Sequence, residues 1–510
     1  MKTSSSPDAI LRAPEDAAQE VYDLVVIGGG VYGIALTLES ARRGLKVLLL
    51  EKEDFGAHTS WHSLRIVHGG LRYLQHLDLG RFRASVEERH WFMRSFPELV
   101  HPLPCLMPLY GEGLKRPLTF GAALKLNDFL SRRRNAGLEA GARLPGGQVL
   151  NAAETAARFP QVPAEGLRGG GAWHDARMLS SERVLIEMLR WACGAGARAL
   201  NYCAADGVET DKRRITGVRA ADALTGRQWV FKCRRAVNCA GPFCETLANK
   251  LDRAPTDFFL PSLAYNLLLD HPPPAASAVA VSPRRPDAPA YFLVPWRGKL
   301  LAGTRHLPFA GDPEKPHPGA VEIGRFLAEL NACVPGADYR PEQVLRVQAG
   351  VLPARQRGGA DTAKHPVWAD HGREGGLAGL YSVSGVKFTT ARHVAEETLR
   401  RIFGKQTPPA GPQTGRPAAA RERARFLTGP GEDLPGFAAL AAEESAVHLS
   451  DLLLRRCDWI GDRAETLRTG RALCEQLGWD EARTERELAA LAETLRALSP
   501  DPDLNREEMP

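Results

Sequence analysis

The sequence predicts an α/β fold that begins with a Rossmann-type nucleotide-binding unit and ends in a helical region. Residues 22–27 (YDLVVI) and 45–51 (LKVLLLE) are apolar runs typical of buried strands, and a segment with helical spacing separates them. Two such strands joined by a helix indicate a parallel sheet. Strand-like segments with Gly and Asp turns continue over 196–241 and 255–350. After the Pro- and Gly-rich stretch 404–420, the chain is amphipathic at helical spacing.

Length and composition exclude several classes of protein. A chain of 510 residues exceeds what one hydrophobic core usually holds, so we expect two or three domains. The net charge of +6 is small for this length and argues against nucleic-acid binding as the main task. The nine cysteines include no CxxC pair, which is typical of reduced packing cysteines in a cytosolic protein. Residues 1–20 lack the apolar core of a signal peptide, so we expect a flexible tail there, and no run reaches the ~18 apolar residues needed to span a bilayer.

A nucleotide fingerprint follows the first strand. Gly28, Gly30 and Gly33 form G-x-G-x-x-G, in which the first glycine permits a tight turn, the second lets a pyrophosphate approach, and the third allows close helix packing. The helix that follows presents its N-terminus to the phosphates. Glu51 ends the second strand, where a ribose-binding carboxylate is expected. NAD and FAD share this fingerprint, so it predicts a dinucleotide without choosing between them.

At residues 51–74 (EKEDFGAHTSWHSLRIVHGGLRYL) the sequence resembles the FAD-dependent glycerol-3-phosphate dehydrogenases, within the D-amino-acid-oxidase-like flavoprotein superfamily. The resemblance continues at HDAR (174–177), VNCAGPF (237–243) and SVSGVKFTTAR (382–392), and in the C-terminal LLLRRCDW and LGWDEAR. It covers nearly the whole chain, and HGGLRYL is its most specific motif.

The resemblance implies a Rossmann-type FAD-binding domain interleaved with an antiparallel-sheet substrate domain, followed by a C-terminal helical domain. We expect an FAD-dependent oxidoreductase region over 21–405, a linker over 406–420 and the helical domain over 421–510. Within the first region, the expected FAD-binding segments are about 21–110, 170–260 and 345–405, and the expected substrate-domain segments are about 111–169 and 261–344.

The resemblance also implies which residues bind the cofactor, FAD. A flat flavin ring needs close backbone approach and several N–H donors, which glycines and small polar residues supply. The expected cofactor-binding residues are Gly28, Gly30, Gly33, Glu51, Lys52, Thr59, Ser60, His62, His68, Gly69, Gly70, Leu71, Ala205, Asn238, Ala240, Gly241, Gly385, Val386, Lys387, Phe388 and Thr389. No metal site is expected.

The substrate pocket departs from the glycerol-3-phosphate dehydrogenase pattern. Leu352 and Ala369 stand where the family carries arginines, one of them used on the substrate phosphate, and the family's GTTD reads GTRH, with Arg305 and His306. The family's KGSH has no counterpart in LAYNLLLD. Two charge-assisted clamps of ~1.5–3 kcal/mol each are lost, which is about a hundredfold or more in affinity. The nearby Arg355 and Arg357 are candidate replacements.

His62 is a second departure. The segment TSWH (59–62) is similar to that of dimethylglycine and sarcosine dehydrogenases, in which the histidine is joined covalently to the flavin. The alternative is a histidine that packs on Trp61 or bonds to a backbone carbonyl.

The leading hypothesis is an FAD-dependent dehydrogenase that oxidises a CH–OH group of a small anionic substrate by hydride transfer to the flavin. His306 is the candidate base, because imidazole titrates near neutral pH. Arg305 and Arg72 are expected to hold the anion, and Lys387 to stabilise the anionic reduced flavin. The alternative is an FAD-dependent amine or amino-acid oxidase that acts on a C–N bond. A third hypothesis is a binding module that has lost catalysis.

The electron acceptor is expected to be quinone or oxygen. The basic and apolar stretch 114–135 is a candidate for contact with anionic lipid, although a solvated basic face has the same composition. The expected location is therefore the cytoplasm, with peripheral binding to the inner face of the cell membrane as an option.

Overall fold

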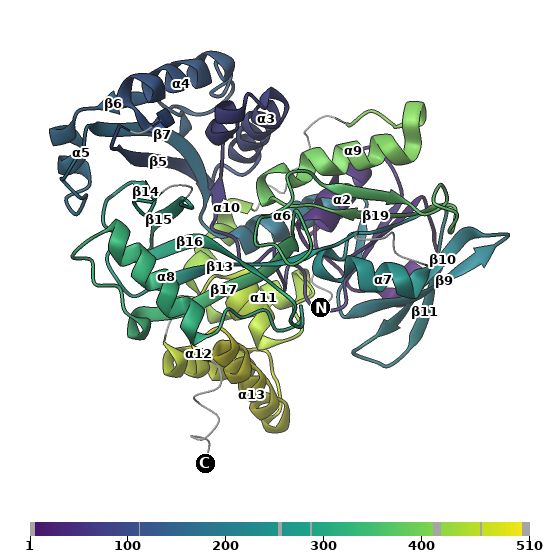
Figure 1. Ribbon diagram of the computed structural model, residues 1–510. Coiled ribbons are helices and arrows are strands. Elements are labelled where there is room, and N and C mark those ends of the chain that lie inside the picture. The colour runs from purple at the N-terminus through teal and green to yellow at the C-terminus, as the bar shows by residue number, and fades with distance from the viewer. Residues whose placement is uncertain are drawn as a thin grey trace.

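Three β-sheets and a C-terminal helical bundle make up the computed structural model (Figure 1), which describes residues 6–111, 113–252, 258–285, 288–411, 420–459 and 462–501. The predicted α/β class is confirmed. The first sheet has six strands in the order β18-β19-β12-β2-β3-β8, parallel except for the β18–β19 pair. Its strands are β2 (Leu24–Ile27), β3 (Val47–Leu50), β8 (Arg198–Leu200), β12 (Ala236–Asn238), β18 (Val367–Asp370) and β19 (Leu380–Ser384).

The six-stranded sheet is the Rossmann-type unit that the glycine fingerprint predicts. All residues of β2 and β3 are buried, as expected of parallel strands covered on both faces. Helix α2 (Val31–Ala41) joins them and packs against α6 (Ser181–Gly194) and α9 (Ala391–Phe403). The carboxyl end of β2 therefore meets the N-terminus of α2 at the fingerprint.

A four-stranded sheet flanks this unit, in the order β1-β11-β10-β9. Its strands are β1 (Val21–Tyr22), β9 (Cys203–Asp211), β10 (Arg214–Asp222) and β11 (Gln228–Cys233).

The third sheet has nine strands and is antiparallel except where β14 meets β5. The order is β17-β13-β16-β15-β14-β5-β7-β4, and β6 pairs with β7. Its strands are β4 (Ile66–Val67), β5 (Val100–Leu109), β6 (Gln148–Leu150), β7 (Gly169–Met178), β13 (Pro261–Leu269), β14 (Ala278–Val281), β15 (Tyr291–Trp296), β16 (Lys299–Pro308) and β17 (Val344–Pro353).

This sheet corrects the expected segment boundaries. Strands β5, β7 and β17 fall mainly in segments assigned to FAD binding, yet they pair within the substrate-domain sheet. The switch between domains therefore occurs inside the expected FAD-binding segments, because β5, β7 and β17 each pair within the nine-stranded sheet along their whole length.

Helices cover the sheets and form the C-terminal domain. The remaining helices are α1 (Pro14–Ala18), α3 (Leu79–Ser95), α4 (Pro117–Leu130), α5 (Ala152–Arg158), α7 (Cys244–Leu251), α8 (Ala320–Cys333), α10 (Ala420–Arg423), α11 (Leu434–Glu443), α12 (Arg463–Gln476) and α13 (Glu481–Ala497). A one-turn π-helix, η9 (Asp451–Arg456), lies between α11 and α12. None of the described helices is both long and apolar enough to cross a membrane.

The expected flexible tail over 1–20 is wrong for the part that the structure describes. Ile10 is fully buried, and the Asp8 carboxylate accepts hydrogen bonds from Arg190 Nε and Nη2, both at 3.0 Å. The partners lie far along the chain, so local composition could not reveal them. Residues 1–5 of the tail, 412–419 of the expected linker and 502–510 of the helical domain lie outside the described residues.

Candidate active site

A cavity of about 710 Å³ opens where the six-stranded and nine-stranded sheets meet. The carboxyl end of β2, the loop after β3, strands β16 and β17 and the turn after β19 all contribute to its wall. The expected cofactor residues on the wall are Gly28, Gly30, Glu51, Lys52, Thr59, Ser60, His62, His68, Ala205, Ala240, Gly241, Gly385, Val386, Lys387, Phe388 and Thr389. Segments far apart in sequence thus converge on one site.

The glycine fingerprint has the geometry that its spacing predicts. Gly28 has φ +108°, and a Cβ atom there would lie 2.7 Å from the Cys239 carbonyl oxygen. A Cβ atom on Gly33 would lie 1.8 Å from the Gly28 carbonyl oxygen, so only glycine lets α2 start this close to β2. Ser60 Oγ accepts the Val31 N–H at 2.9 Å, which fixes the loop to the start of the helix.

Five expected cofactor residues shape the wall from behind rather than line it: Gly33, Gly69, Gly70, Leu71 and Asn238. The Gly69 N–H donates to Asp175 Oδ1 at 2.6 Å, and Gly70 has φ +79°. The Asn238 side chain accepts the Ala240 N–H and donates to the Cys244 carbonyl, which closes the turn after β12.

Glu51 holds the first turn of the cavity. Its side chain accepts the N–H groups of Gly29, at 2.5 Å, and Glu53, at 3.0 Å, and burial raises the pKa of the carboxyl. The next residue, Lys52, lies with its Nζ 3.8 Å from the centre of the Phe243 ring and pairs with Glu314.

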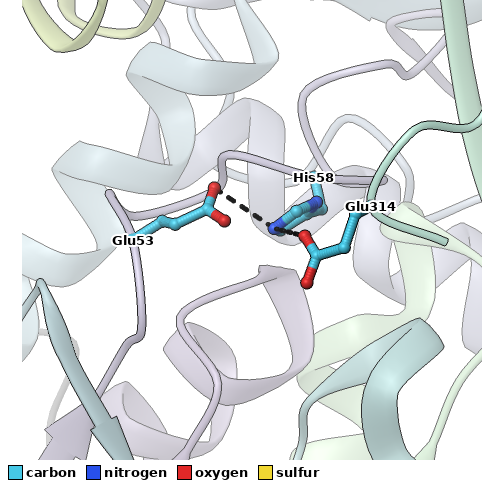
Figure 2. A group of neighbouring side chains, drawn as sticks. All are labelled: Glu53, His58 and Glu314. Atoms are coloured by element: carbon cyan, nitrogen blue, oxygen red, sulfur yellow. Dashed lines mark ion pairs between the residues drawn. The ribbon is translucent and has the colours of Figure 1, made fainter. Parts of the chain in front are cut away.

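Glu314 also belongs to the group of side chains in Figure 2, of which His58 and Glu314 line the cavity. Among the described residues, Glu53, His58 and Glu314 form a set of potential metal-ligand atoms within 4.8 Å of one another. His58 Nε2 lies 3.3 Å from Glu53 and 3.9 Å from Glu314, and His58 lowers the pKa of Glu53 to about 2. Because the Lys52 ammonium also pairs with both glutamates, we interpret the group as an ion-pair cluster that joins the two sides of the rim.

Besides His58, three half-buried histidines line the cavity with a buried ring nitrogen that has no hydrogen-bond partner among the described residues: Nδ1 of His62, Nε2 of His68 and Nδ1 of His306. Burial lowers the pKa of His62 and of His68 to about 3. It also lowers the pKa of His306, where Arg72 and Lys387 add to the effect. All three imidazoles are therefore neutral at pH 7, and orphaned polar atoms at a cavity wall fit a polar ligand.

The expectation that Arg305 grips the substrate is wrong. Its guanidinium lies on the far side of β16, 2.9 Å from Glu329 and 3.1 Å from the Tyr291 hydroxyl, and Arg305 does not line the cavity. Successive side chains of a strand point to opposite faces, so Thr304 and His306 face the cavity while Arg305 faces α8. The alternation of side chains along a strand would have predicted that Arg305 and His306 face opposite sides of the sheet. The candidate replacements Arg355 and Arg357 are exposed and also lie off the wall.

Arg72, Lys387 and Leu352 line the cavity as expected. The Lys387 ammonium donates to the Tyr73 hydroxyl, while its backbone N–H donates to the Tyr32 hydroxyl at 2.7 Å. Ala369 packs instead in a small apolar cluster with Phe259 and Val351.

Sequence reasoning missed two residues beside His62. Asn266 Nδ2 donates to the His62 carbonyl at 2.9 Å, and Asn266 Oδ1 accepts from Thr304 Oγ1 at 2.8 Å. A lone amide inside the apolar run LAYNLLL was the available signal.

The model of the family described as "FAD dependent oxidoreductase" matches residues 23–401. The chain belongs to this family. It is 31% identical over 398 residues to a glycerol-3-phosphate dehydrogenase of Synechocystis. The matched residues cover 75% of this chain and 70% of that protein. It is 29% identical over 394 residues to a probable mitochondrial glycerol-3-phosphate dehydrogenase of Caenorhabditis elegans, of which it spans about half, 53%.

Among solved structures, the glycerol-3-phosphate dehydrogenase of Bacillus halodurans complexed with FAD superposes with a TM-score of 0.72 over 97% of this chain and 98% of that chain. The identity is 22%, so this likeness speaks for the fold. The protein is thus an FAD-dependent oxidoreductase that resembles the glycerol-3-phosphate dehydrogenases, and the residues of the cavity fit its cofactor.

Gly28→Ala should abolish FAD binding, because the new Cβ atom would collide with the Cys239 carbonyl and move the turn. Flavin content after purification, and FAD titration of the apoprotein, measure this. Gly44→Ala is the matched control: Gly44 has φ +72°, but a Cβ atom added there would meet no atom within 4 Å, and Gly44 lies off the cavity wall. Retention of a full flavin complement by Gly28→Ala would contradict the assignment of the turn.

Proposed function

We propose that the protein oxidises a CH–OH group of a small anionic substrate other than glycerol-3-phosphate. The observation that carries this proposal is the cavity wall itself, where neutral His306 lies with Arg72 and Lys387 but Leu352 replaces a phosphate-binding arginine. FAD, when bound, supplies the hydride acceptor. The unpartnered Nδ1 of His306 accepts the hydroxyl proton, and the two cations orient the anion.

The cavity also contains apolar groups where a phosphate clamp would stand. Leu352, Pro353 and Phe259 line it, and Ala369 behind them adds no polar atom. A doubly charged phosphate against this surface would lose hydration without gaining charge-assisted bonds. A carboxylate substrate with a short apolar group matches two cations and an apolar wall better.

Anaerobic flavin bleaching tests this proposal directly. The purified holoprotein is mixed with glycerol-3-phosphate, 2-hydroxy acids, sarcosine, dimethylglycine and D-amino acids. We expect fast bleaching by a hydroxy acid and slow, weakly saturating bleaching by glycerol-3-phosphate. Efficient bleaching by micromolar glycerol-3-phosphate would contradict the proposal.

Amine or amino-acid oxidation is the second candidate. The segment Thr59–His62 favours it, as does the Nδ1 of His62, which lacks a hydrogen-bond partner among the described residues. Bleaching confined to sarcosine, dimethylglycine or D-amino acids would select it.

His306→Gln should lower kcat by about 10²–10⁴-fold, because the amide cannot accept the proton as a base. The wild-type rate should fall as the pH drops through the pKa of His306, which lies below the usual histidine value, because only the neutral imidazole accepts a proton. The pH profile of flavin reduction measures both effects. A His306→Gln variant with the wild-type rate and pH profile would exclude His306 as the base.

Covalent attachment of FAD at His62 stays a prediction. Its neutral imidazole lines the cavity with Nδ1 unpartnered, as a nucleophilic nitrogen requires. After acid precipitation we expect the flavin in the pellet for the wild type and in the supernatant for His62→Ala. Free FAD in the wild-type supernatant would show that His62 only packs against the cofactor.

We also propose peripheral binding to an anionic membrane, with quinone or oxygen as electron acceptor. Helix α4 exposes Leu118 (88%) and Phe129 (65%). It contacts the 3-10 helix Leu71–His76, and Leu77 (75%), the residue directly after that helix, is exposed. Exposed cations flank these side chains at Lys115, Arg116, Lys125, Arg132 and Arg133. In Figure 1 this face lies at the opposite edge of the molecule from α12 and α13. Apolar side chains ringed by cations suit the surface of an anionic bilayer.

The double substitution Leu118→Ser and Phe129→Ser should abolish cosedimentation with vesicles of phosphatidylcholine and phosphatidylglycerol, without changing flavin content. Val321→Ser removes an apolar side chain that is 69% exposed on α8 and serves as the control. If the wild type does not sediment with these vesicles, the contact is excluded.

A further inference from the structure

The segment that follows β3 and runs through the short strand β4, residues 51–68, has two faces. We call it the cofactor loop. One face, with Thr59, Ser60, His62 and His68, lines the cavity. Apart from turns such as Trp61 N–H to the His58 carbonyl at 3.0 Å, this loop has no regular structure of its own before Ile66. Its shape therefore depends on what holds its other face.

The first anchor on the other face is Asp54, which is fully buried. Its carboxylate accepts hydrogen bonds from Arg455 Nε at 2.7 Å and from Arg456 Nη1 and Nη2 at 2.7 and 2.8 Å. Arg455 pairs in turn with Asp451. Each charge in this group is buried and paired, so its geometry is fixed.

The second anchor is Trp61, next to His62. Its indole is 5% exposed and packs in the core of the C-terminal domain with Phe426, Phe437 and Leu453. The Trp61 and His62 rings lie 4.8 Å apart, so the position of Trp61 sets where the imidazole of His62 can lie.

The third anchor is Arg65, 2% exposed, whose guanidinium donates to Asp458 and to the Leu179 carbonyl. Its backbone has φ +63°, a conformation that non-glycine residues adopt only when neighbours hold them there. Arg297 also donates to the Asp458 carbonyl, so Asp458 is itself fixed.

We infer that residues 451–458 of the C-terminal domain act as a positioning segment for the cofactor. They hold Asp54, Trp61 and Arg65, and thereby fix the position and rigidity of the loop that lines the FAD cavity. Asp54 and Trp61 lie off the cavity wall, and Arg65 lies on it, so all three anchors belong to the same short loop as the cavity residues. Loosening any of them should change FAD binding even when the fold survives.

Two variants test this inference. Asp458→Asn removes one of the two carboxylate charges that pair with Arg65, the other being Glu182. The milder Trp61→Phe keeps an aromatic ring but reduces its contact with the C-terminal core. In the full-length protein carrying His62→Ala, in which no covalent bond at this residue can hold the FAD, we expect each to raise the Kd for FAD and the rate of FAD release about tenfold relative to His62→Ala alone, and to shift the flavin reduction potential and absorption bands.

Glu187→Gln is the control. Glu187 is fully buried and accepts from Arg423 Nε at 2.8 Å, so it also joins the C-terminal domain to the FAD-binding domain, but it does not touch the cofactor loop. We expect a comparable fall in thermal stability with an unchanged flavin spectrum and Kd.

In the His62→Ala background, an FAD Kd for Trp61→Phe within twofold of the Kd without it would overturn the inference, as would an equal loss in Glu187→Gln. If Asp458→Asn does not fold, Trp61→Phe decides alone. The inference rests on FAD as the bound cofactor. If the wild type does not bind FAD at all, the assignment of the cofactor is wrong, and this result differs from unchanged FAD binding in the variants.

Discussion

The cofactor loop is attached to three structural units at once, and the rest of the site depends on the position that these attachments give it. It leaves the six-stranded sheet at Glu51, enters the nine-stranded sheet at Ile66, and between them is held by the C-terminal domain through Asp54 and Trp61. Breaking one partner of a buried ion pair typically costs ~3–5 kcal/mol, so this loop cannot move independently of the C-terminal domain. We therefore expect the cavity wall formed by this loop to move together with the helical domain.

The substrate side of the cavity follows a different rule, the alternation of side chains along β16. Thr304 and His306 face the cavity, and Arg305 stabilises the sheet against α8 through Glu329. The cavity wall carries two cations, Arg72 and Lys387, and Leu352 stands where the resemblance implies a phosphate-binding arginine. In our proposal, this difference changes which anion the pocket can desolvate. In our account, the absence of an arginine at Leu352 contributes as much to substrate selectivity as the two cations of the wall do.

The sequence predicts those features that depend on neighbours close along the chain. The turn at Gly28 and the close packing at Gly33 need only a strand, a helix and glycines at fixed spacing. The prediction that Arg305 holds the substrate is wrong because it rests on the motif GTRH alone. It leaves out the two-residue alternation of side chains along the strand that carries the motif. The buried pair of Arg65 and Asp458 joins residues 393 positions apart, and no local pattern could reveal it. For the same reason, the buried N-terminal segment around Asp8 was mistaken for a flexible tail.

Hydrogen–deuterium exchange of the apoprotein and of the FAD complex tests the central claim most directly, because it reports which backbone segments the cofactor immobilises. The account predicts strong protection on FAD binding over residues 59–68 and 385–389, transmitted to 451–458, and none over α4. Protection confined to other segments, or a loop whose exchange does not respond to FAD, would contradict it.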